Sequence, residues 1–316
     1  MEKIVDIHMH VLHGIDDGAK NMEESIVMLQ QSAAQGVGTI IVTPHSWAID
    51  SRGIDLVHAR FSELKQTAEA NQIPIDLFLG CEMLVYPDTI NECIQKLKDG
   101  RYPTMAGSNY VLTEFEPYFS QHDMEFCIEK ISSAGFVPIV AHAERYEHST
   151  VSGVKALKAL GAKIQINAYS IVNEPKAHTK ETANALLSEE LVDFIGSDAH
   201  RLDHRPPVIR DGIDALPVRY SKNYICKILI ENPREILGMD NVLFALTWED
   251  KDVFAYRPFD FPVLEDEYDA LWFRFGVWTP HGSAGDFFRC SPISEEEAMR
   301  RTSGVQPNFS KKSFQS

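Results

Sequence analysis

The stretch DIHMH at residues 6–10 and the stretch SDAH at residues 197–200 carry the strongest indication of the fold. A largely apolar run precedes each of them, residues 4–5 in the first case and residues 192–195 in the second. Alternate residues at the end of a β-strand project to the same side, so His-x-His presents two imidazoles together and Asp-x-His presents a carboxylate with an imidazole. Paired metal ligands on strands near both ends of a long chain suggest a closed barrel whose first and last strands meet.

The composition limits the class of protein. The chain has 316 residues, 44% of them hydrophobic, which is enough for one large α/β domain and an additional segment. Its five cysteines are scattered and odd in number, which is typical of a reducing cytoplasm rather than of a disulfide framework. No run is long enough to span a membrane, and the early first strand leaves no room for a signal peptide, so we expect a cytoplasmic protein without membrane insertion. The formal charge of −16 argues against a nucleic-acid partner.

Short apolar strands alternate with helical stretches between residue 4 and residue 238, which predicts a parallel sheet. The paired ligands described above favour a barrel over an open sheet. Asn21 is the expected N-cap of the first helix, and Glu24 is placed to complete a capping box. Gly36 and Gly135 are expected to end two helices. The predicted strands are residues 4–7, 39–42, 75–79, 110–112, 137–141, 163–166 and 192–195. The predicted helices are residues 22–35, 54–70, 89–98, 124–134, 154–160, 181–190 and 222–231.

Side chains that can bind metal ions follow nearly every predicted strand, at the end of the barrel where such folds place their active sites. Imidazoles and carboxylates without a thiolate favour Mn, Fe or Zn over a soft-metal or iron–sulfur site. Nine ligands are too many for one ion, so they predict a cluster of two or three ions, which activates water and holds the oxygens of a phosphoryl group. The candidate ligands are His8, His10, Asp17, His45, Glu82, Glu114, His142, Asp198 and His200. The other histidines are interpreted as ordinary structural residues.

The motifs resemble the PHP (polymerase and histidinol phosphatase) superfamily, and more narrowly the PHP protein-tyrosine phosphatases of bacterial capsule and exopolysaccharide operons, the CpsB/YwqE type. The resemblance covers residues 4 to about 207 and continues through the Asn-Pro-Arg stretch at 232–234. The segment GIDDG at residues 14–18 is what points to the phosphatase branch. The matching motifs are DIHMHVLHGIDDGAKNMEES, TIIVTPH, GCEM, LTEF, VAHAERY, QINAYSI and FIGSDAHRLDHRPP.

The resemblance implies an α/β fold, a distorted (β/α)7 TIM-like barrel formed by residues 1–238, with three divalent ions. Mn²⁺ is the expected metal, with Fe or Zn as alternatives. One ion would be held by His8, His10, Glu82 and Asp198, a second by Glu82, Glu114 and His142, and a third by Asp17, His45 and His200. Arg145 and Arg205 match the arginines that hold the phosphate in this family. The family usually has a proline where this chain has Ala143, a departure that removes no ligand.

The implied activity is metal-dependent hydrolysis of phosphotyrosine on a protein, naturally the autophosphorylated C-terminal tail of a bacterial tyrosine kinase that controls polysaccharide export. Three divalent ions would bring roughly +6 and two arginines about +2 against about −4 from four carboxylates, so the pocket of this acidic protein would be cationic. A small-molecule phosphatase such as histidinol phosphatase shares the ligands and remains the alternative. A PHP domain kept as a scaffold is less favoured because all nine ligands are present. A cysteine-based phosphatase is excluded because no cysteine has an arginine six residues later.

Residues 239–316 lack the alternation of strands and helices and are rich in aromatic residues. We expect them to form a C-terminal extension, and its role is open. An aromatic-anchored extension packed on the outside of the barrel is favoured over a segment that docks a partner or covers the site. A frameshifted or fused end is a further alternative. The sequence does not indicate an oligomeric state.

Overall fold

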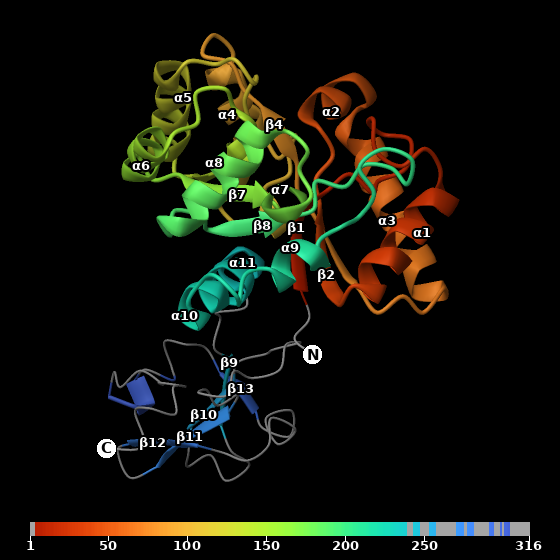
Figure 1. The fold of residues 1–316 in the computed structure, drawn as a ribbon. Helices are drawn as coiled ribbons and strands as arrows, with labels where there is room; N and C mark the ends of the chain where they lie inside the picture. The colour runs from red at the N-terminus through yellow and green to blue at the C-terminus, as the bar shows by residue number, and fades with distance from the viewer. Residues whose placement is uncertain are drawn as a thin grey trace. The chain divides into compact units, whose positions relative to one another are not determined.

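The computed structural model describes residues 4–238 and, beyond them, residues 243–246, 253–256, 270–274, 277–280, 291–293, 298 and 300–303 (Figure 1). The chain divides into two compact units. One is Lys3–Leu237, and the other is Gly238–Ser316 together with Met1–Glu2. Each unit is described by itself below.

Eight short strands form the framework of the first unit, and all their pairings are parallel. They form two sheets, ordered β1-β2-β3 and β4-β5-β6-β7-β8. Both β1 and β2 are buried along their whole length, as expected of strands covered on both faces. The strands are β1 (Ile4–Met9), β2 (Val37–Val42), β3 (Asp76–Leu79), β4 (Glu82–Leu84), β5 (Tyr110–Glu114), β6 (Val137–Val140), β7 (Lys163–Asn167) and β8 (Phe194–Gly196).

Backbone hydrogen bonds join the two sheets at two places. The amide of Asp198 donates to the carbonyl of His8 at 2.9 Å, and the amide of His10 donates to the carbonyl of Ala199 at 2.8 Å. At the second place, the amide of Glu82, where β4 begins, donates to the carbonyl of Pro44, which follows β2, at 3.1 Å. The first and last strands of the unit therefore meet, and the predicted distorted barrel is confirmed.

The third predicted strand, residues 75–79, corresponds to β3, and β4 is an additional strand, so eight strands stand where seven were expected. Strand pairing stops at Gly80 and Cys81 and resumes at Glu82. A Cβ atom on Gly80 would lie 2.9 Å from Met105 Sδ and 3.1 Å from Ile41 Cγ2, so a larger residue does not fit there. Because of this break, Glu82 is the first residue of β4, whereas the sequence predicted that it follows the end of a strand.

The predicted long helices are present, with ends that differ by a few residues, and they lie around the strands (Figure 1). Three short helices, α2, α7 and α9, were missed because five to seven residues carry too little periodicity. The helix predicted at 222–231 is instead α10, a π-helical turn η3 and, beyond it, α11. The helices are α1 (Met22–Ala34), α2 (Ser46–Arg52), α3 (Ile54–Ala70), α4 (Ile90–Lys98), α5 (Gln121–Ser133), α6 (Val151–Ala159), α7 (Ala168–Val172), α8 (Ala177–Ser188), α9 (Arg210–Asp214), α10 (Lys222–Cys226) and α11 (Asn232–Leu237), with the shorter turns η1 (Met105–Gly107), η2 (Ala143–Arg145) and η3 (Lys227–Glu231).

The cap predicted for the first helix is only partly confirmed. Asn21 Oδ1 accepts a hydrogen bond from the amide of Glu24 at 2.9 Å, as expected of an N-cap. The Glu24 carboxylate does not complete the predicted capping box with Asn21. It accepts hydrogen bonds from the amides of Lys20 at 2.8 Å and Leu202 at 3.1 Å, and so ties α1 to the loop that follows β8.

In the second unit, the described residues include five antiparallel strands in the order β12-β11-β10-β9-β13. The loss of alternation past residue 238 thus corresponds to a change from parallel to antiparallel pairing. Several aromatic residues of the expected anchor, including Trp248 and Phe259, lie outside the described residues. The strands are β9 (Leu243–Leu246), β10 (Val253–Tyr256), β11 (Ala270–Arg274), β12 (Val277–Pro280) and β13 (Ser291–Ile293). Within the described part of the chain, the helices are all too short or too polar to cross a bilayer.

Candidate metal centre

Strand β1 places the imidazoles of His8 and His10 side by side, since alternate residues of a strand face the same way. Both side chains are fully buried. Their Nε2 atoms lie 3.1 Å apart. Two imidazole nitrogens that bind one ion at about 2.1 Å each come to lie roughly 3 Å apart. The spacing therefore fits two ligands of a shared ion.

Glu82 lies at the middle of the site, and its two carboxylate oxygens face four imidazoles. Oε1 lies 2.9 Å from His142 Nε2 and 3.3 Å from His8 Nε2. Oε2 lies 3.1 Å from His10 Nε2 and 3.1 Å from His45 Nδ1. A buried carboxylate that faces several imidazoles through both oxygens is suited to bridge metal ions.

Glu114, Asp17 and Asp198 extend the cluster on its other sides. Glu114 lies 3.5 Å from His45 Nδ1 and 3.6 Å from His142 Nε2. Asp17 Oδ1 lies 3.5 Å from His45 Nε2 and 3.6 Å from His200 Nε2. Asp198 Oδ1 lies 3.6 Å from His8 Nε2, the contact that joins the last strand to the first. The structure thus brings all nine candidate ligands together.

Within the described residues, three overlapping groups have donor atoms that lie within 4.8 Å of one another. They are His8, His10 and Asp198; His45, Glu82 and Glu114; and His10, Asp17, His45 and His200. This grouping differs from the one that the resemblance implies, because His10 and His45 each belong to two groups and His142 belongs to none. His142 nevertheless reaches the cluster through its contact with Glu82.

The ring nitrogens of the cluster are better suited to bind metal ions than to form hydrogen bonds with one another. His45 Nδ1 is buried and has no hydrogen-bond partner, although Glu82 Oε2 lies 3.1 Å away. Burial by itself lowers the pKa of His8, but Glu82 and Asp198 outweigh it and raise that pKa to about 9. Burial likewise opposes Glu82 and Glu114, which raise the pKa of His45 to about 10. Carboxylates that hold protons so strongly on imidazoles equally favour a metal ion in their place.

Two residues that the sequence reasoning quoted without assigning a role orient these ligands. Asp16 Oδ2 lies 2.9 Å from His10 Nδ1 and accepts a hydrogen bond from the amide of His45 at 3.1 Å. Gln165 Oε1 lies 3.2 Å from His8 Nδ1 and accepts from the amide of His142 at 2.8 Å. Metal-binding histidines commonly have their second ring nitrogen held in this way. In the sequence, only their positions could have pointed to these two residues. Asp16 directly precedes the candidate ligand Asp17, and Gln165 lies near the end of a predicted strand.

The turn that carries Asp16 and Asp17 depends on the glycine that follows them. A Cβ atom on Gly18 would lie 2.0 Å from the carbonyl oxygen of His10, which no other residue tolerates. The amide of Gly18 donates to Asp16 Oδ1 at 3.0 Å. The close approach of this turn to β1 is what places Asp16 against the His10 ring.

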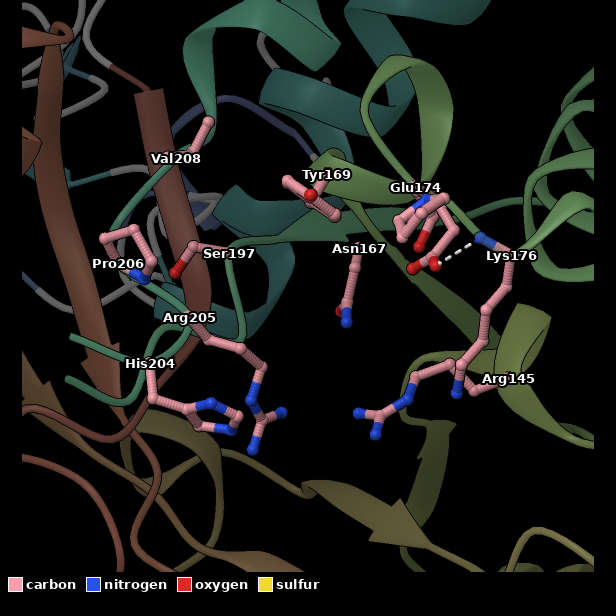
Figure 2. Close-up of a pocket in the computed structure, with 12 residues that line it drawn as sticks. Arg145, Asn167, Tyr169, Glu174, Lys176, Ser197, His204, Arg205, Pro206 and Val208 are labelled. Carbon is pink, nitrogen blue, oxygen red and sulfur yellow. Dashed lines mark hydrogen bonds between the residues drawn. The ribbon is translucent and has the colours of Figure 1, made fainter. Parts of the chain in front are cut away.

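The two predicted phosphate-binding arginines lie beside the cluster and share one carboxylate oxygen. Arg145 Nη1 and Arg205 Nη1 donate to Asp198 Oδ2 at 3.0 Å and 2.6 Å. Asn167 Nδ2, which the sequence reasoning did not assign to the site, donates to the same oxygen at 3.0 Å. Figure 2 shows the two guanidinium groups facing each other across a cavity of about 410 Å³. Both arginines are partly exposed, at 43% and 34% of their side chains, so an anion can reach them.

Three residues of this site have a strained backbone conformation. Among the residues that the structure describes, seven residues other than glycine have a positive φ. Three of them are site residues, namely His142 at 32°, Asp198 at 53° and Arg205 at 55°. Such conformations are costly and persist where the surrounding structure imposes them, frequently at functional sites.

The family model for capsular polysaccharide synthesis, CpsB/CapC, matches residues 4–238. The tyrosine-protein phosphatase CpsB of Streptococcus agalactiae is 30% identical over 246 residues, which cover 74% of this chain and 98% of that protein. CpsB of Streptococcus pneumoniae is 30% identical over 253 residues, covering 76% of this chain and all of that protein. YwqE of Bacillus subtilis, also named a tyrosine-protein phosphatase, is 28% identical over 205 residues, covering 64% and 79%.

Solved structures agree with the family match. A structure from a study of YwqE of Bacillus subtilis and CpsB of Streptococcus pneumoniae, described as unique metal-dependent tyrosine phosphatases, has a TM-score of 0.66 and 26% identity. It covers 74% of this chain and 94% of that one. An organophosphorus hydrolase mutant, with a TM-score of 0.51 and 12% identity, shares the fold alone. The chain belongs to the CpsB/CapC family of capsular polysaccharide synthesis proteins, as its motifs indicated.

Proposed function

We propose that this chain is a metal-dependent tyrosine-protein phosphatase. The observation that carries the proposal is the gathering of nine imidazole and carboxylate side chains around Glu82, next to two arginines that share Asp198. Relatives that match nearly end to end are named tyrosine-protein phosphatases, which supports the same activity here. We assign the catalytic machinery to residues 1–238.

The nine side chains would hold divalent ions, for which we propose three sites with Mn²⁺ as the native metal. Bound ions of this kind make a nucleophilic water available near neutral pH and neutralise phosphoryl oxygens. Fe or Zn would suit the same mixture of nitrogen and oxygen ligands. Within the protein, Asp16 and Gln165 hold the rings of His10 and His8 in orientation.

Arg145 and Arg205 would bind the phosphate group. Each guanidinium presents several N–H donors in a plane, which suits the oxygens of a phosphate. Asp198 holds both guanidinium groups at the edge of the metal cluster, and Asn167 holds Asp198 in turn. A phosphate bound there lies between the cations and the metal ligands. Tyrosine, whose hydroxyl has a pKa of about 10, leaves a phosphate more readily than serine does.

The proposed substrate is phosphotyrosine in a protein, in particular the tyrosine-rich C-terminal tail of an autophosphorylated bacterial tyrosine kinase. The family's description as capsular polysaccharide synthesis proteins supports a role in the control of capsule or exopolysaccharide production. An extended tail suits the site because the arginines are accessible from outside the barrel.

Elemental analysis and phosphatase assays on the same sample test the proposal. Protein purified without chelator is expected to contain Mn, Fe or Zn and to hydrolyse a phosphotyrosine peptide in the presence of Mn²⁺. Histidinol phosphate, assayed side by side, is expected to react more slowly. A strong preference for histidinol phosphate would favour a small-molecule phosphatase, and metal-free protein without activity would favour a scaffold.

A further inference from the structure

The cavity beside the arginines has a wall that phosphate binding does not require. Arg145 and Arg205 lie on its two sides, and Tyr169, Pro206 and Val208 contribute apolar surface (Figure 2). Its volume of about 410 Å³ exceeds what a phosphate group occupies. Binding sites for small organic groups are commonly apolar cavities with a few polar groups that fix orientation. The space beyond the phosphate is therefore available to the group that the phosphate is attached to.

Tyr169 is the aromatic side chain of this wall. Its side chain is 42% exposed, although large hydrophobic residues in the described barrel are mostly buried. It lies in α7, two residues after Asn167, whose side chain donates to Asp198. The residue therefore lies on the same cavity as Asn167 and the two arginines.

A buried glutamate holds the junction of β7 and α7 through two hydrogen bonds. Glu144 is fully buried and its Oε1 accepts from the amide of Asn167 at 3.0 Å and from the hydroxyl of Ser170 at 2.6 Å. These two hydrogen bonds lie on either side of Tyr169 along the chain. The exposed ring is thus attached to a well-ordered turn, which lowers the entropy cost of using it to bind a ligand.

We propose that this cavity receives the tyrosyl group of the substrate and that Tyr169 is a specificity-determining residue that packs against the aryl ring. The inference rests on the proposed phosphatase function and deepens it. A phosphate held by Arg145 and Arg205 directs its ester substituent toward the Tyr169 wall. A planar aryl ring buries apolar area there and packs against the Tyr169 ring, whereas an aliphatic group gains less.

The charges of the cavity act in the same direction. Its wall includes three cations, Arg145, Lys176 and Arg205, and one carboxylate, Glu174. In Figure 2 the side chain of Lys176 extends toward Arg145. A leaving group that carries an ammonium, as histidinol phosphate does, is repelled by this excess of positive charge. A neutral aryl group, or a peptide with acidic neighbours, is favoured.

Steady-state kinetics of the Tyr169→Ala variant, in the full chain loaded with Mn²⁺, test the inference on a phosphotyrosine peptide and on glycerol 2-phosphate. We expect kcat/KM for the peptide to fall by about three- to tenfold, mainly through KM, because one aromatic contact is lost. Hydrolysis of glycerol 2-phosphate is expected to change by less than about twofold. Tyr169→Phe, which keeps the ring, is expected to keep both activities.

Tyr118→Ala is the matched control, since Tyr118 is another exposed tyrosine, at 63%, and does not line the cavity. Equal losses on both substrates in Tyr169→Ala, or no loss on the peptide, would overturn the inference. Failure of the unmodified, metal-loaded protein to hydrolyse the peptide would instead reject the proposed function itself.

Lys176→Glu tests the contribution of charge separately. This variant is expected to lower the ratio of kcat/KM for the phosphotyrosine peptide to that for histidinol phosphate. The circular dichroism spectrum and metal content should stay as in the unmodified protein. An unchanged ratio would remove charge selection from the proposal and leave Tyr169 as its only element.

Discussion

The metal cluster and the arginine-lined cavity occupy the same end of the barrel but are built differently. In the cluster, His8 and His10 are fully buried and each has its second ring nitrogen held by another side chain. In the cavity, Arg145 and Arg205 are partly exposed and share a single carboxylate oxygen. The first arrangement is suited to fix ions in place, and the second to admit and release a substrate. Changes in the cluster should therefore act on metal binding and kcat, and changes in the cavity on KM.

The largest effect is expected from His8→Ala. His8 contacts both Glu82 and Asp198, so its loss removes a ligand at the centre of the cluster. Turnover of a phosphotyrosine peptide should fall by about a thousandfold or more, while the circular dichroism spectrum stays unchanged. His58→Ala, which removes an exposed histidine of α3, serves as the control. Near-normal activity of His8→Ala would contradict the assignment of the cluster.

Removal of the metal should abolish activity reversibly, and the affinity for added metal should depend on pH. Without metal, His8 with a pKa of about 9 and His45 with a pKa of about 10 carry protons at neutral pH. Metal ions displace these protons, so metal affinity should rise as the pH increases toward these values. Titration calorimetry of the chelator-treated protein in two buffers of different ionisation enthalpy measures the proton release. Binding without proton release would argue against these two histidines as ligands.

A smaller effect is expected from Asp16→Ala, because Asp16 holds proposed ligands in position but is not itself a proposed ligand. Metal affinity should weaken by about 10- to 100-fold, and kcat should recover at high Mn²⁺ concentration. Asp203→Ala removes an exposed carboxylate of the same charge and should leave metal affinity unchanged. Loss of activity that added metal does not restore would place Asp16 in the chemistry itself.

On the cavity side, Arg145→Ala should raise KM by about tenfold and change kcat less, because one of two phosphate-binding cations is lost. The metal content should remain that of the unmodified protein, which separates this variant from those in the cluster. Arg145→Lys keeps the charge but loses the planar guanidinium group. Its KM should lie between those of the unmodified protein and of Arg145→Ala. A fall in metal content would show that the two regions are not independent.

The smallest effect is expected from truncation after residue 238, where the two compact units divide. The remaining chain contains every residue of the cluster and of the cavity. Its kcat/KM should stay within about twofold of that of the full chain. Activity and melting temperature, measured on the same preparation, check this. A large loss of activity would favour the alternative in which the extension covers the site.

The part of the site that depends on strand position was predictable from the sequence. His8, His10 and His142 follow from period-two alternation and from the rule that active sites lie at strand ends. The roles of Asp16 and Gln165 were not predictable, because they depend on a turn and a strand that approach the ligands only after folding. Likewise β4 was not predicted, and the close packing around Gly80 just before it involves Ile41 and Met105, which are distant in the sequence. The antiparallel strands described in the second unit also went unpredicted, because they do not alternate with helices as the strands of the barrel do.

The bond that joins the first strand to the last has a consequence for biosynthesis. Asp6 accepts a hydrogen bond from the amide of Ser197, 191 residues later, and His8 and Asp198 meet at the same seam. A chain still emerging from the ribosome therefore lacks Asp198, one of the proposed ligands of this ion, until nearly two-thirds of its length has been made. The ion would then close a loop of almost 200 residues, and such a cross-link stabilises a fold by restricting the unfolded chain. Metal loading would thus report that the first and last strands of the barrel have met.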